Sequence, residues 1–70
     1  MKYYAMRWSI KNGTVTPNNR TGEKAEMERQ FHLYCASAAT NADENEFDSV
    51  EFGTLEGGAL DRKVWEHTAE

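Results

Sequence analysis

Residues 3–11 read YYAMRWSIK and are followed at once by Asn12-Gly13 and by the β-branched residues 14–16. Apolar and polar side chains alternate along the first run, which is the period-two pattern of a strand with one buried face. Asn-Gly suits the positive φ angles of a type I′ turn, and β-branched residues after it favour a returning strand. This stretch therefore predicts a β-hairpin at the start of the chain.

The parity of residues 3–11 predicts which side of that strand is buried. The larger apolar side chains share one parity, so we expect the core side to consist of Tyr4, Met6, Trp8 and Ile10. The opposite parity is expected to face outward and holds Tyr3, Ala5, Arg7, Ser9 and Lys11. Because Pro17 cannot donate a ladder hydrogen bond, the returning strand should be short or lie at an edge, and residues 17–22 should form a loop.

The periodicity changes after residue 22 and predicts an amphipathic helix over 22–40. At 100° per residue, one stripe about 100° wide collects Met27, Phe31, Tyr34, Cys35, Ala38 and Ala42. Thr21 is the expected N-cap, and several glutamates near the helix start suit the helix dipole. Leu33 lies well outside the stripe and is expected to be exposed.

The second half of the chain predicts a polar loop over 41–46 and a second pair of strands. Residues 47–55 form the first strand, and Gly57-Gly58 is expected to turn the chain back into residues 60–67. A two-residue turn at these glycines would place Val50 opposite Trp65 and Phe52 opposite Lys63. A short helix over 59–67 is the competing interpretation of the last segment, although the strand is favoured.

Together these elements predict an α+β fold over residues 1–70 as a single domain. Its strands and helix follow the order β-β-α-β-β, with one helix packed on one face of an antiparallel sheet. We expect Trp8, Ile10, Phe52 and Trp65 of the sheet to meet Met27, Phe31 and Tyr34 of the helix.

The composition limits the classes of function. The chain has 70 residues, a net charge of −4 and one cysteine. A domain of this size has a thin core, so we expect it to act through its surface and not as an enzyme with an interior cavity. The lone Cys35 excludes an internal disulfide and favours the reducing cytoplasm. Neither a signal peptide nor a membrane span is expected.

Motifs for chemistry are weak. His32 and Cys35 are three residues apart, but a structural zinc site needs four ligands, so no metal is predicted. The run from Asp43 to Asp48 has the acid density of a calcium loop with the wrong spacing. No glycine-rich phosphate loop or nucleophile motif is present in the sequence, and no cofactor or catalytic residue is predicted.

Charge is distributed unevenly along the chain. Residues 1–40 contain six basic and three acidic residues, whereas 41–70 contain two basic and nine acidic residues. Carboxylates can present a negative field to a partner protein. The sequence thus predicts a non-catalytic protein-binding module that inhibits or regulates its partner. By analogy of size and type alone, it is similar to the small binding proteins that phages and mobile elements encode. The expected partner-binding residues are Asp43, Glu44, Glu46, Asp48, Glu51 and Glu56.

Two alternatives remain open from the sequence. The outward side of the first strand, with Tyr3, Arg7 and Lys11, is typical of a surface that stacks and neutralises single-stranded nucleic acid, although the net charge of −4 opposes it. Pairing of an edge strand, or of the surface around Leu33, with a second copy would make a homodimer.

Overall fold

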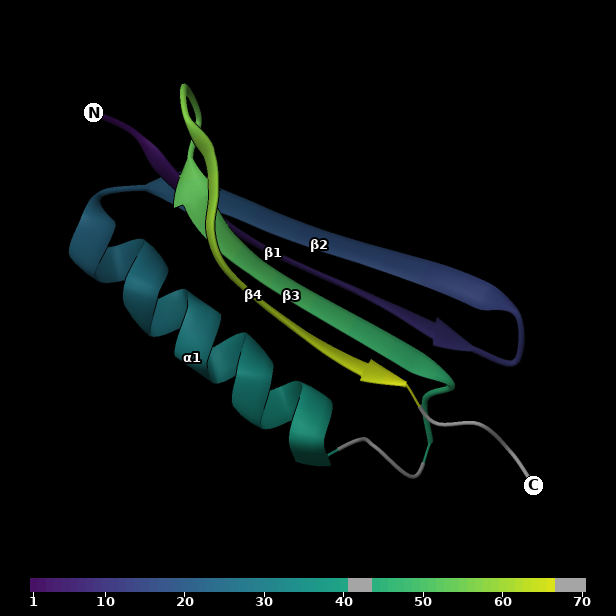
Figure 1. Cartoon of the computed structure of the whole chain (residues 1–70). Helices are drawn as coiled ribbons and strands as arrows, with labels where there is room; N and C mark the ends of the chain where they lie inside the picture. The colour runs from purple at the N-terminus through teal and green to yellow at the C-terminus, as the bar shows by residue number, and fades with distance from the viewer. Residues whose placement is uncertain (41–43, 67–70) are drawn as a thin grey trace.

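The computed structural model describes residues 1–40 and 44–66 and contains one sheet and one helix. Its elements are β1 (Tyr3–Lys11), β2 (Thr14–Gly22), α1 (Lys24–Thr40), β3 (Phe47–Thr54) and β4 (Gly58–Glu66). The strands form an antiparallel sheet in the order β2-β1-β3-β4, and α1 lies along one face of it (Figure 1). The predicted α+β fold with β-β-α-β-β order is confirmed.

The helix connects two strands that are not neighbours. Strand β1 pairs antiparallel with both β2 and β3, so β2 and β3 run in the same direction with β1 between them. A connection between strands of the same direction needs a crossover, and α1 supplies it. Strands β1 and β3 are therefore central, and β2 and β4 are the two edges of the sheet.

The first hairpin closes as the sequence predicts. Asn12 and Gly13 form a two-residue turn with φ angles of 53° and 81°, and Lys11 faces Thr14 across it. Only glycine, asparagine and a few other residues adopt two successive positive φ angles at low cost. This turn sets the register of β1 against β2 along their whole length.

Strand β2 is longer than expected. Residues 17–22 continue the ladder instead of forming a loop, and Pro17 lies directly opposite Trp8. A proline is tolerated here because β2 is an edge strand and its missing N–H need not pair with β1. The ladder extends to Gly22, so the predicted loop was wrong.

The helix begins two residues later than predicted. Thr21 pairs with Tyr4 inside β2 and therefore cannot cap the helix, whereas the Met27 N–H donates to the Glu23 carbonyl oxygen at 3.0 Å. Helix α1 ends at Thr40 as expected, and Ala42 of the predicted stripe lies outside the described residues. Within residues 1–40 and 44–66, no helix is both long and apolar enough to cross a membrane.

The core lies between α1 and the two central strands. Its buried apolar side chains are Ala5, Met27, Phe31, Ala38, Val50 and Phe52. The Phe52 ring is central: its centroid lies 5.8 Å from that of Tyr3, in a stacked arrangement, and 6.1 Å from that of Phe31. Trp65 and Tyr34 pack against the edge of this cluster. The predicted helix stripe and the contribution of Phe52 and Trp65 are thus confirmed.

The buried side of β1 is the opposite of the one predicted. Ala5 faces Phe52 across the ladder and is fully buried under the helix, so the parity of Tyr3, Ala5 and Arg7 is the covered one. Trp8 and Ile10 lie on the other face of the sheet. The physical reason is close packing: the small Ala5 leaves space for the large helix side chains, which a tryptophan in that row would fill.

Strand β4 is confirmed as a strand, but its register differs from the predicted one. Trp65 lies opposite Asp48, and Lys63 lies opposite Val50, a shift of two residues that keeps each side chain on its expected face. Residues 55–57 form the connection, and the ladder contains a bulge between the Phe52 and Gly53 positions of β3. A Cβ atom on Gly53 would collide with the Gly58 carbonyl oxygen, so the bulge requires glycine there. His67, the predicted strand end, lies outside the described residues.

Two truncations to alanine on α1, one buried and one exposed, test this packing. We expect Phe31→Ala to lower the free energy of unfolding by about 3–5 kcal/mol, because it opens a cavity in the core. Leu33→Ala should change it by less than about 0.5 kcal/mol, since Leu33 is 56% exposed. Urea melts followed by circular dichroism measure both values, and equal losses would show that the helix is rotated on the sheet.

Candidate functional site

The face of the sheet that points away from α1 is not covered by any described part of the chain. Its central row comes from β1 and carries Tyr4, Met6, Trp8 and Ile10, all partly exposed. The ladder partners of these residues on β2 and β3 share the same face, because paired residues in an antiparallel sheet point to one side. This uncovered face is the main surface feature that sequence reasoning missed.

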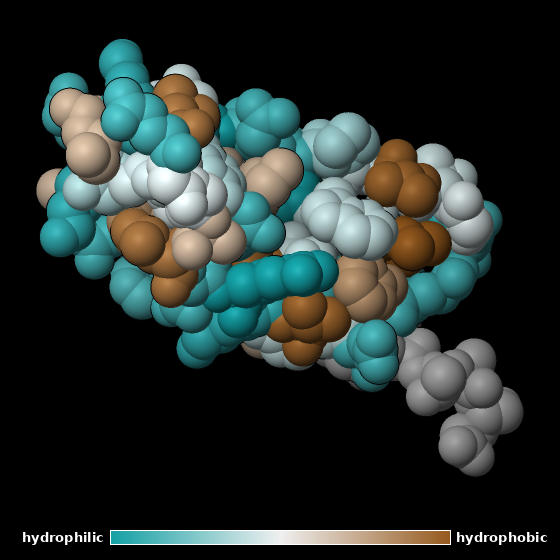
Figure 2. Space-filling model, turned by 45° about the horizontal axis from the view of Figure 1, so that its top comes forward, coloured by the Kyte–Doolittle hydropathy of each residue, from teal (hydrophilic) through white to brown (hydrophobic). Residues whose placement is uncertain are grey.

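One half of the uncovered face is apolar. The Trp8 and Phe47 rings pack at its centre with centroids 4.9 Å apart and an interplanar angle of 37°. Val15 and Val64, at the two sides, are 52% and 44% exposed. Brown and pale side chains gather toward the right-hand side of Figure 2, among teal ones. We call this surface the apolar patch and define it as Trp8, Ile10, Val15, Pro17, Phe47 and Val64.

The other half of the uncovered face is polar. The Tyr4 hydroxyl donates to the Glu51 carboxylate, and the Arg62 Nε donates to the Ser49 Oγ at 3.4 Å. Burial, the hydrogen bond to Glu51 and the negative charge of Glu51 together raise the pKa of Tyr4 to about 12. These contacts hold the Glu51 and Arg62 side chains against the sheet. The apolar patch is the part of the face whose side chains can still contact another molecule.

Three glutamates lie at the end of the sheet that carries the apolar patch. Glu66 is opposite Phe47 on the same face, and the Glu46 carboxylate accepts a hydrogen bond from the Gly13 N–H at 3.2 Å. The Glu44 carboxylate lies 3.5 Å from the Lys11 ammonium group in an exposed ion pair. We define Glu44, Glu46 and Glu66 as the acidic rim. Lys11 offsets one of its three charges.

The predicted acidic surface is not one surface. Glu44 and Glu46 are exposed at one end of the sheet, whereas Glu56 is exposed in the β3–β4 connection at the opposite end. Glu51 lies on the uncovered face and accepts from Tyr4. Asp48 is fully buried on the helix side, so its inclusion was wrong. Asp43 lies outside the described residues.

The buried Asp48 carboxylate accepts hydrogen bonds from two neighbouring side chains. The Arg7 Nε and Nη2 atoms donate to its Oδ1 at 3.1 and 3.0 Å, and the Asn45 side-chain amide donates to its Oδ2 at 3.1 Å. A carboxylate removed from water needs such partners, because its desolvation is costly. This network fixes the start of β3 against β1 and is structural.

The three residues predicted to bind nucleic acid lie on the side of β1 that faces α1. Tyr3 stacks on Phe52 toward the helix, and Arg7 is held by Asp48, so neither side chain is on the outward face. Only Lys11 is exposed, and its ammonium group pairs with Glu44. The prediction that these three residues share one open face was wrong because the parity of β1 was assigned to the wrong side.

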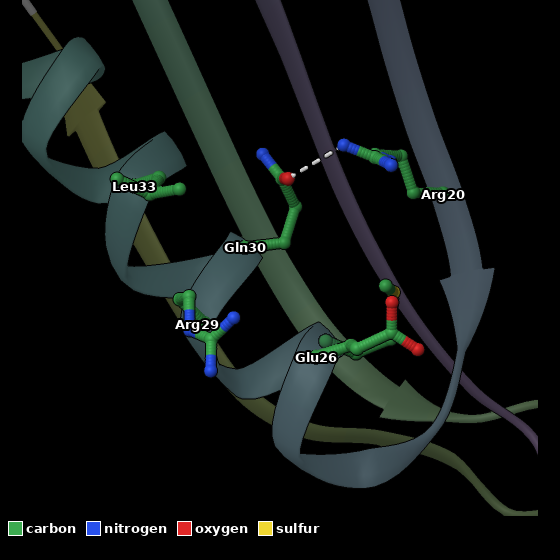
Figure 3. Close-up of a pocket in the computed structure, with 6 residues that line it drawn as sticks. Arg20, Glu26, Arg29, Gln30 and Leu33 are labelled. Carbon is green, nitrogen blue, oxygen red and sulfur yellow. Dashed lines mark hydrogen bonds between the residues drawn. The ribbon is translucent and has the colours of Figure 1, made fainter.

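A shallow pocket of about 180 Å³ lies between α1 and β2, lined by Arg20, Glu26, Met27, Arg29, Gln30 and Leu33. In Figure 3, Arg20 reaches from β2 toward Gln30, and its Nη1 donates to the Gln30 Oε1 at 3.1 Å. Arg29 projects away from Arg20, so the two guanidinium groups do not converge on one point (Figure 3). The lining therefore shows no focused charge for binding an anion.

Cys35 and His32 do not form a site in the described structure. Cys35 is partly buried against the core, and burial raises the pKa of its thiol, which favours the unreactive form. Across residues 1–40 and 44–66, no group of three or more histidine, cysteine, aspartate or glutamate side chains is placed to hold a metal ion.

Comparison with known proteins adds no relative: no protein-family model matches the chain, and no curated protein or solved structure is significantly similar to it. The function must therefore be inferred from the surface itself.

The buried ion pair predicts a specific loss of stability. Asp48→Ala leaves the Arg7 guanidinium largely buried without its partner, so we expect the free energy of unfolding to fall by about 3–5 kcal/mol. Glu44→Ala, which removes the exposed pair with Lys11, should cost less than about 1 kcal/mol. Urea denaturation compares the two variants, and similar midpoints would contradict the assignment of Asp48 to the core.

The contact between Tyr4 and Glu51 predicts a dependence on alkaline pH. The folded-state pKa of Tyr4, about 12, exceeds the ordinary value of 10.0. The stability from its neutral form is therefore complete below pH 10 and is lost as the pH rises toward 12. Tyr4→Phe should remove one late-titrating tyrosine from the absorbance titration at about 295 nm and flatten the loss of stability over this window. Tyr34→Phe is the control, and an identical effect from it would contradict the assignment.

Proposed function

We propose that this protein is a non-catalytic protein-binding module that contacts its partner through the apolar patch. The observation that carries the proposal is the Trp8–Phe47 ring pair, which lies on the sheet face that points away from α1. Tryptophan is one of the residues enriched among the side chains that dominate the binding energy of protein interfaces. Contiguous exposed apolar surface on a small protein is typical of an interaction site.

The location of the patch supports a rigid docking surface. Trp8 and Ile10 belong to a central strand, and Phe47 belongs to the adjacent central strand, so the ladder on both sides fixes their backbones. A partner that docks there orders few side chains, which lowers the entropic cost of association. An inhibitory or regulatory role would act through this contact.

Single-stranded nucleic acid is the weaker occupant of the same face. Bases can stack on tryptophan, but backbone binding gains its free energy from cations that neutralise phosphates. The rim of the patch carries three glutamates against Lys11, and Arg62 donates to Ser49. A phosphate backbone would therefore be repelled at this end of the sheet.

Position-specific photocrosslinking tests the proposal. A benzoylphenylalanine side chain at Val64, inside the patch, should crosslink to a protein in the cell from which the gene comes. The same group at Leu33, which is similarly exposed on the helix, is the control. Once identified and purified, the captured protein should bind Trp8→Ala at least about tenfold more weakly than wild type, as expected for an interface anchor.

Two results would contradict the proposal. Equal crosslinking yields from positions 64 and 33 would show that the patch is not the contact surface. Tight binding of a 20-nucleotide oligothymidylate at low salt, weakened by Trp8→Ala, would instead assign the face to nucleic acid. Circular dichroism of each variant confirms that the sheet is intact before binding is measured.

A further inference from the structure

The charges around the apolar patch are predominantly negative. Glu66 stands beside Phe47 on the uncovered face, and Glu46 is held at the tip of the first hairpin by the Gly13 N–H. Lys11 is close to the same tip but its charge is offset by Glu44 at 3.5 Å. Glu46 and Glu66 make no ion pair within residues 1–40 and 44–66. Arg62 lies on the same face two residues from Val64 and donates to the Ser49 hydroxyl, so two carboxylates without an ion pair and one guanidinium border the patch. The end of the sheet that carries the patch therefore has an excess of negative charge.

The size of the patch argues against a second copy of this chain as its occupant. Four strands about 4.8 Å apart are about 19 Å wide, and two same-face residues on a strand, each taking about 7 Å of its length, span about 14 Å, so the patch covers about 260 Å². Stable interfaces bury about 800 Å² per partner. A second copy would also bring its own acidic rim to the contact. A short segment of another protein fits this area better.

From the patch and its rim together, we propose that the apolar patch binds a positively charged segment of another protein. One or two apolar side chains of the segment pack on Trp8, Phe47 and their neighbours, and its lysines or arginines face Glu46 and Glu66. This inference rests on the proposed function and specifies the chemistry of the partner. The apolar contact supplies most of the affinity, whereas the exposed carboxylates supply charge selectivity and faster association.

A peptide titration tests this charge selectivity. The probe is a blocked decapeptide with two leucines, separated by one residue, among lysines, and its controls replace every lysine by glutamate or both leucines by serine. The variant Trp65→Phe keeps Trp8 as the only tryptophan, so its fluorescence reports on the uncovered face. The lysine peptide should shift the Trp8 emission in a saturable way, and both control peptides should bind at least about tenfold more weakly.

Charge variants of the protein give a second readout with opposite signs. Glu46→Gln keeps the oxygen that accepts from Gly13, and Glu66→Gln keeps the side-chain volume. Each should weaken binding of the lysine peptide about two- to fivefold, the range for one exposed ion pair. Lys11→Gln removes a positive charge from the same end and should strengthen binding by a similar factor. Calorimetry on chains that retain both tryptophans provides the same comparison if Trp65→Phe does not fold.

The inference is overturned if the lysine and glutamate peptides bind equally, if neither binds at 1 mM, or if the three charge variants leave the affinity unchanged. It is also overturned if the Val64 crosslink joins two copies of this chain. These outcomes differ from a failure of the proposed function, because a crosslinked partner without a basic contact segment would keep the patch as the docking surface and remove only the charge selectivity.

Discussion

The hydrogen-bonded ion pair between Arg7 and the buried Asp48 connects the two central strands on the side that faces the helix. A desolvated carboxylate and its guanidinium partner must remain together, since separating them would leave a buried charge without compensation. Successive side chains of a strand point to opposite faces, so the positions of Arg7 and Asp48 also determine where the neighbouring side chains point. With Arg7 under the helix, Trp8 must face the opposite side, and with Asp48 under the helix, Phe47 must join it there.

This constraint explains how much of the fold could be predicted from local patterns. The Asn12-Gly13 turn, the stripe on α1 and the strand character of the last segment depend on neighbours within a few residues, and all were predictable. The side of β1 that is buried depends on Phe52 and Asp48, more than forty residues away in sequence. Apolar content alone predicts that the side of β1 with Trp8 is buried. It carries no information on side-chain packing, in which the small Ala5 fits beneath Met27 and Phe31.

The candidate site was predictable only in part for the same reason. The acidic residues of the second half were visible in the sequence, but the structure separates Glu56 at one end from Glu46 at the other and buries Asp48. The apolar row that includes Trp8 and Ile10 was also visible and was assigned to the core. The aspartate within the otherwise apolar parity of Val50 and Phe52 was the available signal: a buried acid requires a cation on the paired strand, and Arg7 is the basic residue in the middle of β1.

Strand β2 has a further consequence for how molecules of this protein meet. In a two-residue hairpin, alternate residues of the edge strand direct their backbone groups outward, and Pro17, which faces Trp8 near the middle of β2, belongs to that set. The row of outward N–H donors is therefore interrupted at its centre. An incoming strand would meet a gap in the ladder and a rigid ring, a device by which natural sheets resist uncontrolled growth. At this border the protein is protected from fibre-like stacking, and side chains rather than backbone must supply its contacts with other molecules.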